Sequence, residues 1–270
     1  MNKHLGFIGC GNMAGAIIGG IVSSAKVAPE NILASDILDK NLEKAHKEYG
    51  ISVTFDNKSV AQWSDILVLS VKPQFYAQVI NEIKDEIKEN VVIVTIAPGI
   101  TLEILEETFG KQVKIVRTMP NTPAMVREGM TGACANGYVS AQELEEVCEL
   151  LGTFSRVEVV PEKLMDVVGA VSGASPAYIF MLIEAMADAA VADGMPRAQA
   201  YQFAGQAVLG SAKLFLESGK HPGELKDMVC SPGGTTIEGV RQLEARGFKS
   251  AMFEALRACV KKSKEFSKKD

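Results

Sequence analysis

Histidine and paired cysteines are scarce in this sequence, and their scarcity limits the chemistry that the protein can perform. The 270 residues include three histidines and five cysteines. The histidines are well separated, and no two cysteines stand at CxxC or zinc-finger spacing, so we expect no metal site. An odd number of scattered cysteines also argues against a disulfide framework and indicates reduced thiols in a cytoplasmic protein.

Excess positive charge and long apolar runs are also lacking. The formal net charge is −5, which argues against nucleic acid or an anionic membrane as a partner. The most apolar stretch, residues 169–183, is uncharged but shorter than a bilayer span, and serine, glycine and proline interrupt it, so we expect no membrane segment. The N-terminus leads directly into a predicted strand, without the charged and apolar regions of a signal peptide.

The first part of the sequence alternates regularly between strand and helix patterns. Short continuous apolar runs are typical of strands buried on both faces of a parallel sheet, and apolar residues at helical spacing predict helices between them. The expected strands are residues 4–8, 31–35, 51–53, 66–71, 91–96, 113–116, 131–135 and 156–159. This order predicts right-handed βαβ crossovers and a doubly wound α/β sheet.

A glycine-rich turn directly follows the first predicted strand. Gly9, Gly11 and Ala14 form a G-x-G-x-x-A pattern in the strand–turn–helix context of the dinucleotide fingerprint. Gly9 allows the tight turn, Gly11 lets the backbone approach a pyrophosphate, and Ala14 keeps helix and strand close. We therefore interpret residues 1–161 as an NAD(P)-binding Rossmann domain.

The second predicted strand ends at Asp36. A carboxylate at this place usually accepts a hydrogen bond from a ribose 2′-OH and favours NAD. Ser35, with Lys40 and Lys44 a turn or two further on, could instead serve a 2′-phosphate. Asp36 could also cap the next helix, so the sequence leaves the choice of cofactor open.

Other predicted strands end in turns as well, at residues 70–73, 97–99 and 119–121. Ligands of doubly wound sheets bind outside the carboxyl ends of the strands, so these turns are candidate binding segments. Lys72 is the only cation among them. It could neutralise a phosphate or a carboxylate, or it could be a solvated loop lysine.

The chain changes character near residue 162, and from there on it shows helical patterns and no convincing strand. We expect residues 162–270 to form an all-α domain. The predicted helix over residues 175–192 is apolar nearly all round, so we expect a partner subunit to cover it. The Lys-rich end, which includes Lys261, Lys262, Lys264, Lys268 and Lys269, is interpreted as a solvated tail.

A tight turn in this second domain looks suited to a small anion. Pro232, Gly233 and Gly234 interrupt the helical pattern, and Thr235 or Thr236 stands where a helix N-cap belongs. Free backbone N–H groups and a helix dipole aimed at the turn would bind a carboxylate. The alternative interpretation is an ordinary capped turn between two helices.

Five motifs stand in order at the spacing of a known family: FIGCGNM at 7–13, VKP at 71–73, RTMPN at 117–121, SGASPAY at 172–178 and SPGGTT at 231–236. The chain resembles pyrroline-5-carboxylate reductase over essentially its full length, and the last motif is the most specific. The resemblance implies reduction of 1-pyrroline-5-carboxylate to L-proline with NADPH or NADH, the final step of proline biosynthesis. It also implies that a helical dimerisation domain follows the Rossmann domain, with dimers often assembling into decamers.

The resemblance further implies site residues. The nucleotide would contact Ile8, Gly9, Cys10, Gly11, Asn12, Met13, Ser35, Asp36, Asn57, Ser70, Val71, Lys72, Pro73, Ala97, Pro98 and Gly99. The substrate carboxylate would lie in the loop of Ser231, Gly233, Gly234, Thr235 and Thr236. Two positions depart from the family: Pro98 replaces a residue that is often small, which removes a backbone donor, and Asp36 replaces a small polar residue, which weighs against a strong NADPH preference.

The implied substrate is a cyclic imine that carries a carboxylate, and its iminium form accepts hydride without a metal or a covalent intermediate. The protein therefore has to position the ring and keep its nitrogen protonated. We expect Thr236 to hydrogen-bond the ring nitrogen as the catalytic residue, with Thr235 and the Gly234 N–H on the carboxylate. Whether Thr236 donates a proton or only orients the substrate is left open.

Other functions fit parts of the sequence. A reductase of another small cyclic imine would use the same residues. β-Hydroxyacid dehydrogenases share the two-domain plan, but they resemble one another in a catalytic lysine early in the interdomain helix, and residues 169–196 contain no Lys, Arg or His. A non-catalytic nucleotide-binding regulator is a distant alternative, because a sensor would not need a carboxylate-binding loop.

Overall fold

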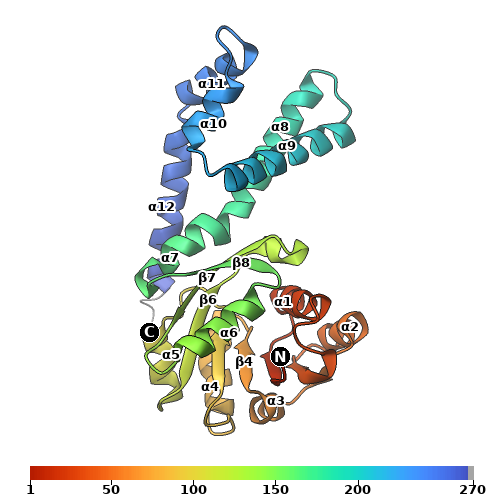
Figure 1. Ribbon diagram of the computed structural model, residues 1–270, viewed down its shortest axis with the longest axis vertical. Coiled ribbons are helices and arrows are strands. Elements are labelled where there is room, and N and C mark those ends of the chain that lie inside the picture. The colour runs from red at the N-terminus through yellow and green to blue at the C-terminus, as the bar shows by residue number, and fades with distance from the viewer. Residues whose placement is uncertain (267–270) are drawn as a thin grey trace. The chain divides into compact units, whose positions relative to one another are not determined.

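The structure is a computed structural model that describes residues 1–266 of the chain (Figure 1). These residues cluster into two compact units. The first, here called the sheet unit, comprises Met1–Ala174 together with the C-terminal segment that begins at Cys259. The second, here called the helical unit, is Ser175–Ala258.

The sheet unit is built on one eight-stranded sheet with the order β3-β2-β1-β4-β5-β6-β7-β8. The order reverses between β1 and β4, which is the switch point where nucleotides bind in such sheets. The doubly wound α/β prediction is confirmed. The strands are β1 (Leu5–Ile8), β2 (Ile32–Ser35), β3 (Ser52–Thr54), β4 (Ile66–Leu69), β5 (Val92–Thr95), β6 (Lys114–Met119), β7 (Gly129–Ala135) and β8 (Ser155–Val159).

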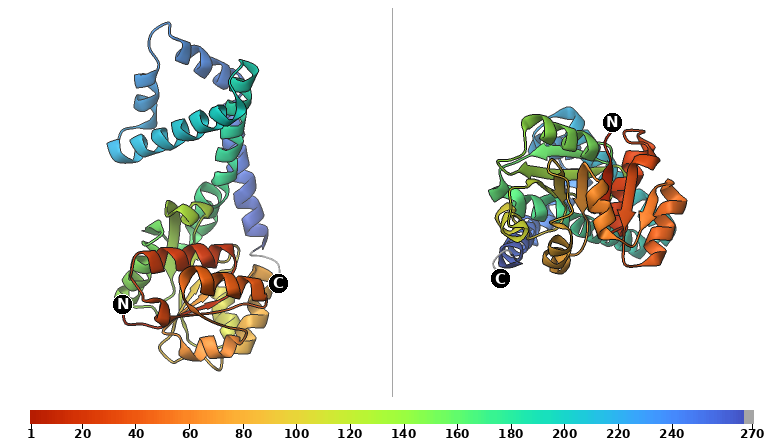
Figure 2. Two further views of the ribbon diagram at one scale, coloured as in Figure 1. Left: turned by 90° about the vertical axis from the view of Figure 1, so that its right-hand side faces the viewer. Right: turned by 90° about the horizontal axis from the view of Figure 1, so that it is seen from below.

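Helices cover both faces of this sheet, as the view from below in Figure 2 shows. The helices α1 (Asn12–Ser23), α2 (Asp39–Tyr49) and α6 (Ala141–Leu151) pack into one buried apolar cluster. The helices α3 (Asn57–Trp63), α4 (Tyr76–Ile83) and α5 (Leu102–Phe109) pack into the other. In β4, Ile66 and Val68 point into the first cluster, and Leu67 and Leu69 point into the second. The continuous apolar run therefore serves two cores, as expected for a central parallel strand.

The link between β6 and β7 departs from the predicted crossovers. These two strands pair antiparallel, while the other neighbouring strands of the sheet pair parallel. Only the short 3-10 helix η3 (Thr122–Val126) lies between them. Two parallel strands need a crossover connection of a dozen or more residues. The connection between β6 and β7 is shorter than that, so the second strand runs antiparallel to the first.

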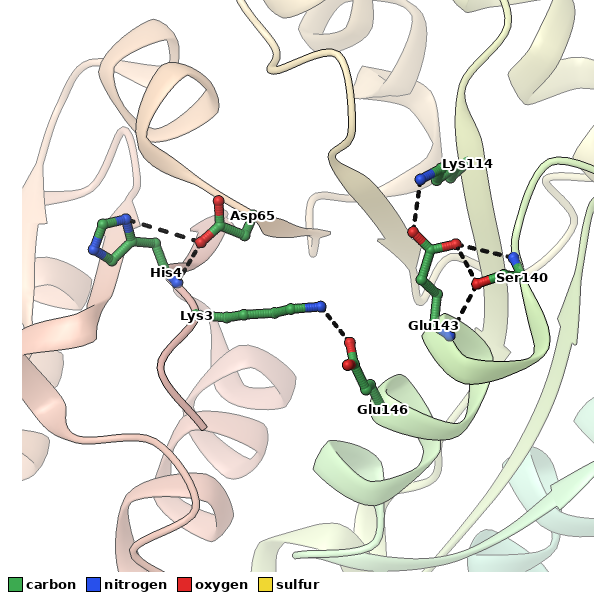
Figure 3. A network of polar contacts seen from close by, with 7 residues as sticks. All are labelled: Lys3, His4, Asp65, Lys114, Ser140, Glu143 and Glu146. Carbon is green, nitrogen blue, oxygen red and sulfur yellow. Dashed lines mark hydrogen bonds and ion pairs between the residues drawn. The ribbon is translucent and has the colours of Figure 1, made fainter.

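Charged side chains connect helix α6 to residues at the amino-terminal ends of the strands (Figure 3). Lys3 forms an ion pair with Glu146 of α6. Lys114 Nζ lies 2.6 Å from Glu143 Oε1, and Ser140, the N-cap of α6, forms a capping box with Glu143. Burial opposes ionisation of Glu143, but the hydrogen bonds from Lys114 and Ser140 outweigh it and lower the pKa of this carboxyl to about 2. Helix α6 is thereby fixed to the strands at the edge opposite to the glycine turn.

The transition between the units is a continuous helical run, Glu162–Ala192. It consists of η4 (Glu162–Leu164), α7 (Met165–Val168), the π-helix η5 (Gly169–Ala174) and α8 (Ser175–Ala192). Ser175 therefore continues a helix that was predicted to begin there. Met165 is fully buried in the core of the sheet unit, and the contacts of this compact unit continue to Ala174.

The same run is 31 residues long, with a mean hydropathy of 1.5 in its most apolar window, and could cross a membrane by length and composition alone. The prediction that the apolar stretch is too short to span a bilayer is therefore wrong on length. Apolar core helices of water-soluble proteins pass the same test. The side chains of Phe180 and Met181 are more than half exposed in the single chain, so this surface needs a cover.

The helical unit contains α8, α9 (Arg197–Ser218), α10 (Pro222–Val229), α11 (Thr235–Ala245) and the first part of α12 (Phe248–Phe266). Helices α8 and α9 pack against each other, and the buried residues of this pair are Ala187, Ala200 and Ala204. Such small side chains bury little apolar area, so the unit has a thin core of its own. Large apolar side chains on α8 and α9 stay exposed, as predicted for a surface that a partner covers.

The end of α12 belongs to the sheet unit. Ser263 Oγ donates a hydrogen bond of 2.6 Å to Asp166 Oδ1 of α7. Lys261, Lys262 and Lys264 are exposed, as predicted for a solvated end, but they lie in the last turns of a regular helix and not in a frayed tail. Lys268 and Lys269 lie outside the described residues.

Candidate active site

The glycine turn after β1 has the geometry that a nucleotide fingerprint needs. Gly9 has φ +94°, and a β-carbon there would lie 2.7 Å from the Ser70 carbonyl oxygen. Gly11 is the N-cap of α1 and has no side chain to accept from the first-turn N–H groups. A β-carbon on Gly11 would point into open space. The helix N-terminus is therefore open to an anion. The residues predicted to contact the nucleotide, Ile8, Cys10, Asn12 and Met13, flank Gly9 and Gly11 in the chain.

Ser70 holds this turn in place. Its hydroxyl donates to the carbonyl oxygens of Gly9 (2.5 Å) and Ile8 (3.1 Å), and its amide donates to Ile8 O. The carboxyl ends of β1 and β4 are thus locked together beside the switch point. Ser70 was predicted to contact the nucleotide, and the structure assigns its side chain a structural task as well.

The end of β2 is a second polar cluster. Ser35 is fully buried and donates 2.7 Å to Asn57 Oδ1 at the start of α3. Asp36 accepts from the Cys10 amide (2.7 Å), the Leu38 amide (2.8 Å) and Asn41 Nδ2 (3.1 Å). The N-cap of α2 is Leu38, so the interpretation of Asp36 as that N-cap is wrong. The structure brings Ser35, Asp36 and Asn57 together, as the resemblance implied.

The ends of β4 and β5 supply the remaining predicted nucleotide residues. Val71 and exposed Lys72 follow Ser70, and Pro73 opens the 3-10 helix η2 (Pro73–Phe75). Ala97 is buried, Pro98 is exposed and Gly99 has φ +77°. Pro98 has no N–H to offer to a ligand, so a backbone donor of this turn would have to come from a neighbouring residue.

A cavity of about 520 Å³ lies at these strand ends within the sheet unit. This volume is within the usual range for small-molecule and cofactor sites. Its predicted lining residues are Met13, Ser70, Val71, Lys72, Ala97 and Pro98. Met119, Pro120 and Asn121 form the candidate binding turn at residues 119–121 and line the cavity as well. Lining residues absent from the predictions are Ile96, Thr122, Gly169, Ala170, Gly173, Ala174, Cys259, Lys262 and Ser263. The described lining residues include two lysines and no carboxylate, so the cavity favours an anionic ligand.

Asn121 is the most informative residue of the turn at residues 119–121. It is only 8% exposed, its Nδ2 donates to Ser172 O at 3.0 Å, and its Oδ1 accepts from the Met130 amide at 2.8 Å. It therefore attaches the π-helix to the end of β6. Its position after a strand end was a usable sequence signal, whereas nothing local indicated that the π-helix or the end of α12 would line the cavity.

The predicted substrate residues lie together in the helical unit. Gly233 has φ +68°, the Gly234 amide donates to Ser231 O at 3.0 Å, and a β-carbon on Gly234 would lie 2.4 Å from Ser231 Oγ. Helix α11 begins at Thr235 with Gly234 as its N-cap. The predicted threonine N-cap is therefore wrong: Thr235 and Thr236 occupy the first turn, and both are exposed.

These features fit a dinucleotide at the sheet unit. The fit rests on an uncapped helix N-terminus at Gly11, a glycine at positive φ that no L-residue would occupy without strain, and a cavity with Lys72 at the adjoining strand ends. The loop before α11 offers the same kind of uncapped N-terminus, suited to a carboxylate. The five cysteines are free thiols, as expected.

Known families match both parts of the chain. The family described as "Pyrroline-5-carboxylate reductase dimerisation" matches residues 162–266. The family described as "NADP oxidoreductase coenzyme F420-dependent" matches residues 4–99. The second family match covers β1 to β5 and both glycine-containing turns described above.

Curated relatives match over nearly the whole length. Pyrroline-5-carboxylate reductase of Escherichia coli (strain K12) is 48% identical over 268 residues, which cover 99% of this chain and 100% of the relative. That of Methanosarcina acetivorans is 42% identical, with 99% of each chain covered.

Solved structures agree. A pyrroline-5-carboxylate reductase from Coxiella burnetii superimposes with a TM-score of 0.93 at 34% identity, covering 100% of both chains. The pyrroline carboxylate reductase of Plasmodium falciparum, solved with NADP bound, gives 0.90 at 32% identity with 98% of each chain covered. Prephenate dehydrogenase from Aquifex aeolicus, at 16% identity and a TM-score of 0.55, shares the fold alone.

Proposed function

Since the chain belongs to the pyrroline-5-carboxylate reductase family and reduces 1-pyrroline-5-carboxylate to L-proline with NAD(P)H, we propose that the sheet unit holds the nucleotide and that the loop before α11 holds the substrate. The reaction completes proline biosynthesis. The observation that most strongly supports this function is the 48% identity with the Escherichia coli reductase over 99% of the chain.

We assign the nucleotide to the strand ends of the sheet unit. Its pyrophosphate lies on the turn Gly9–Gly11, where the uncapped start of α1 directs N–H groups outward. Its adenosine ribose lies beside Asp36 and Asn57, and its nicotinamide end lies in the 520 Å³ cavity beside Lys72. The residues assigned to it are those predicted from the sequence, from Ile8 to Gly99, with Asn121 and Thr122 added from the cavity wall.

We assign the substrate carboxylate to the loop Ser231–Thr236. The Gly233 conformation and the close packing of Gly234 against Ser231 hold this loop in one shape. The Gly234 N–H, predicted to donate to the carboxylate, instead donates to Ser231 O. The N–H groups of the first turn of α11, with the Thr235 hydroxyl, donate to the carboxylate in its place. Preorganised donors of this kind bind an anion without first having to reorient.

The chemical step needs little from the protein besides position and a proton. NADPH or NADH, when bound, supplies hydride to the carbon of the protonated C=N bond. The C=N π electrons move to nitrogen, so the iminium becomes a secondary amine and no proton is lost. The Thr236 hydroxyl hydrogen-bonds the nitrogen and keeps it protonated and oriented. Positioning of this kind contributes several kcal/mol to barrier reduction.

The exposed apolar surface of the helical unit fits the family match to a dimerisation region. The protein is a homo-oligomer that acts on a small molecule. We further propose that the helical domain, residues 162–270, forms a dimer, that dimers assemble into a decamer, and that the enzyme is cytoplasmic, with no membrane or nucleic-acid partner. Burial of α8 and α9 between subunits would cover the apolar side chains that the single chain exposes.

An isotope experiment tests the reaction, and a pair of variants tests the site. With the cofactor deuterated at nicotinamide C4 on the transferred face, the proline formed should carry deuterium at C5. Thr236→Ala should lower kcat/KM about tenfold or more, while Thr236→Ser, which keeps the hydroxyl, should retain most of the activity. Wild-type kinetics in folded Thr236→Ala would contradict the assigned role.

A further inference from the structure

Asp36 is fixed at the end of β2, where the assigned nucleotide places its adenosine ribose. Its Oδ2 accepts from the Cys10 amide of the glycine turn (2.7 Å) and from Asn41 Nδ2 (3.1 Å). Its Oδ1 accepts from the Leu38 amide (2.8 Å). Three donors, one from the glycine turn and two from the start of α2, hold the carboxylate, so it cannot swing aside to admit a bulky group. One lone-pair position on Oδ1 remains for a further donor.

The negative charge of Asp36 affects the pKa of a side chain in the glycine turn. Burial, and then the nearby Asp36 carboxylate, raise the pKa of the Cys10 thiol to about 11. A ribose 2′-hydroxyl can donate to such a carboxylate. A 2′-phosphate can only present further negative charge to it, because at neutral pH it offers acceptor oxygens.

The other polar groups at this strand end do not compensate. The Ser35 hydroxyl is fully buried and donates to Asn57 Oδ1 at 2.7 Å, so it is directed away from a ligand. Asn57 Nδ2 donates to Glu82 Oε2 at 3.0 Å. The small polar side chains that could bind a 2′-phosphate, Ser35 and Asn57, therefore both donate their hydrogen bonds to other protein groups.

Cations near this strand end are few and partly balanced. Lys44 lies 4.0 Å from Glu48 Oε2 on the same face of α2. It lines a pocket of only about 150 Å³ together with Asn41 and Glu48. Lys40 is exposed on the first turn of α2, next to Asp39. Residues 32–45 contain no arginine, the side chain that usually grips a 2′-phosphate.

From this geometry we infer that Asp36 makes the enzyme selective for NADH over NADPH. The inference rests on the proposed position of the nucleotide in the sheet unit. The carboxylate accepts the 2′-hydroxyl of NADH through its remaining lone pair and repels the 2′-phosphate of NADPH. Selectivity follows from the identity and fixation of one residue, and the rest of the nucleotide site serves both cofactors equally.

The test is kcat/KM for both cofactors in the wild type and in two variants. We expect wild-type kcat/KM to be about tenfold or more higher with NADH, because the 2′-phosphate of NADPH would place further negative charge beside a fixed carboxylate. Asp36→Asn keeps an acceptor for the Cys10 amide but removes the charge, and it should shift the NADH/NADPH ratio about tenfold towards NADPH. Asp36→Ser, which also makes room, should shift the ratio at least as far.

Asp39→Ser is the matched control, because it removes a carboxylate of the same loop–helix segment without touching the ribose position. The ratio should stay within about twofold of wild type in this variant. A wild-type preference for NADPH, or an unchanged ratio in both Asp36 variants, would overturn the inference.

Calorimetric binding of 5′-AMP and 2′,5′-ADP separates this inference from the proposed function. Wild type should bind 5′-AMP more tightly than 2′,5′-ADP, and Asp36→Asn should reverse or abolish that order. This measurement needs no imine turnover, so it keeps its meaning even if the reaction proved different. Tighter binding of 2′,5′-ADP by the wild type would overturn the inference, while absent imine turnover would instead contradict the reaction.

Discussion

The ion pair between Arg117 and Glu162 should be worth more than any other in the sheet unit, and its removal yields a sharp prediction. Arg117 lies in the core beneath the start of the helical run, with its side chain only 3% exposed, and its Nη1 donates to Glu162 Oε1 at 2.9 Å. Among the described residues, its Nε and Nη2 have no hydrogen-bond partner. Glu162 is thus the main compensation for a buried positive charge.

We predict that Glu162→Gln lowers the free energy of unfolding by about 2–3 kcal/mol. Removing one partner of a buried pair typically costs about 3–5 kcal/mol, because the other charge is left uncompensated. Glu162 itself is 33% exposed, so water screens part of the interaction and the expected loss falls below that range. The Leu102 amide donates to Glu162 Oε1 at 2.7 Å, and a glutamine oxygen can still accept this hydrogen bond. The lost stability therefore measures removal of the carboxylate charge.

The assay is urea unfolding at one fixed protein concentration, because subunit association contributes to the stability of an oligomer. The double variant Arg117→Met/Glu162→Gln should recover most of the loss, since apolar replacement of a whole buried pair is often neutral or stabilising. Glu158→Gln, which breaks an exposed pair with Arg156, should change stability by less than about 1 kcal/mol. A Glu162→Gln variant as stable as wild type, or a double variant less stable than the single one, would refute the reasoning.

Two further predictions concern the glycine turn and the amino-terminal edge. Gly9→Ala places a β-carbon 2.7 Å from Ser70 O at a position with positive φ, so it should raise KM for the nucleotide about tenfold or more. Gly15→Ala, whose β-carbon would meet its nearest atom at 3.5 Å, should leave this KM nearly unchanged. Equal kinetics of the two variants would contradict the steric argument. The lowered pKa of Glu143 makes its bond to Lys114 stabilising above the ordinary pKa of 4.5, and this stability should be lost as pH falls towards about 2. Unfolding measured between pH 6 and pH 3 should therefore show a smaller acid-induced loss in Glu143→Gln than in wild type, and identical slopes would contradict it.

Much of the nucleotide half could be predicted because its signals are local. The turn Gly9–Gly11 follows a strand directly, and a positive φ at Gly9 is a property of a few consecutive residues. Buried strands such as β4 reveal themselves by a continuous apolar run. The acidic residue at the end of β2 was also visible, and two of its hydrogen bonds, from the Leu38 amide and Asn41 Nδ2, are local in sequence. The third, from the Cys10 amide, comes from a segment that only the fold brings close.

What could not be predicted depends on contacts distant in sequence. Lys262 and Ser263 line the cavity because α12 ends against α7, and a Lys-rich C-terminus alone is typical of a solvated tail. The burial of Met165 in the core of the sheet unit has the same origin. At α11, one residue separates the predicted cap from the observed one, because Gly234 can take the N-cap conformation without a capping side chain.

The measurement that tests the central claim most directly is the initial rate of cofactor oxidation with 1-pyrroline-5-carboxylate, run side by side with NADH and NADPH. We expect turnover to L-proline with both cofactors and a higher kcat/KM with NADH. A folded oligomer that binds either cofactor but does not reduce the imine would contradict the assignment of substrate and reaction.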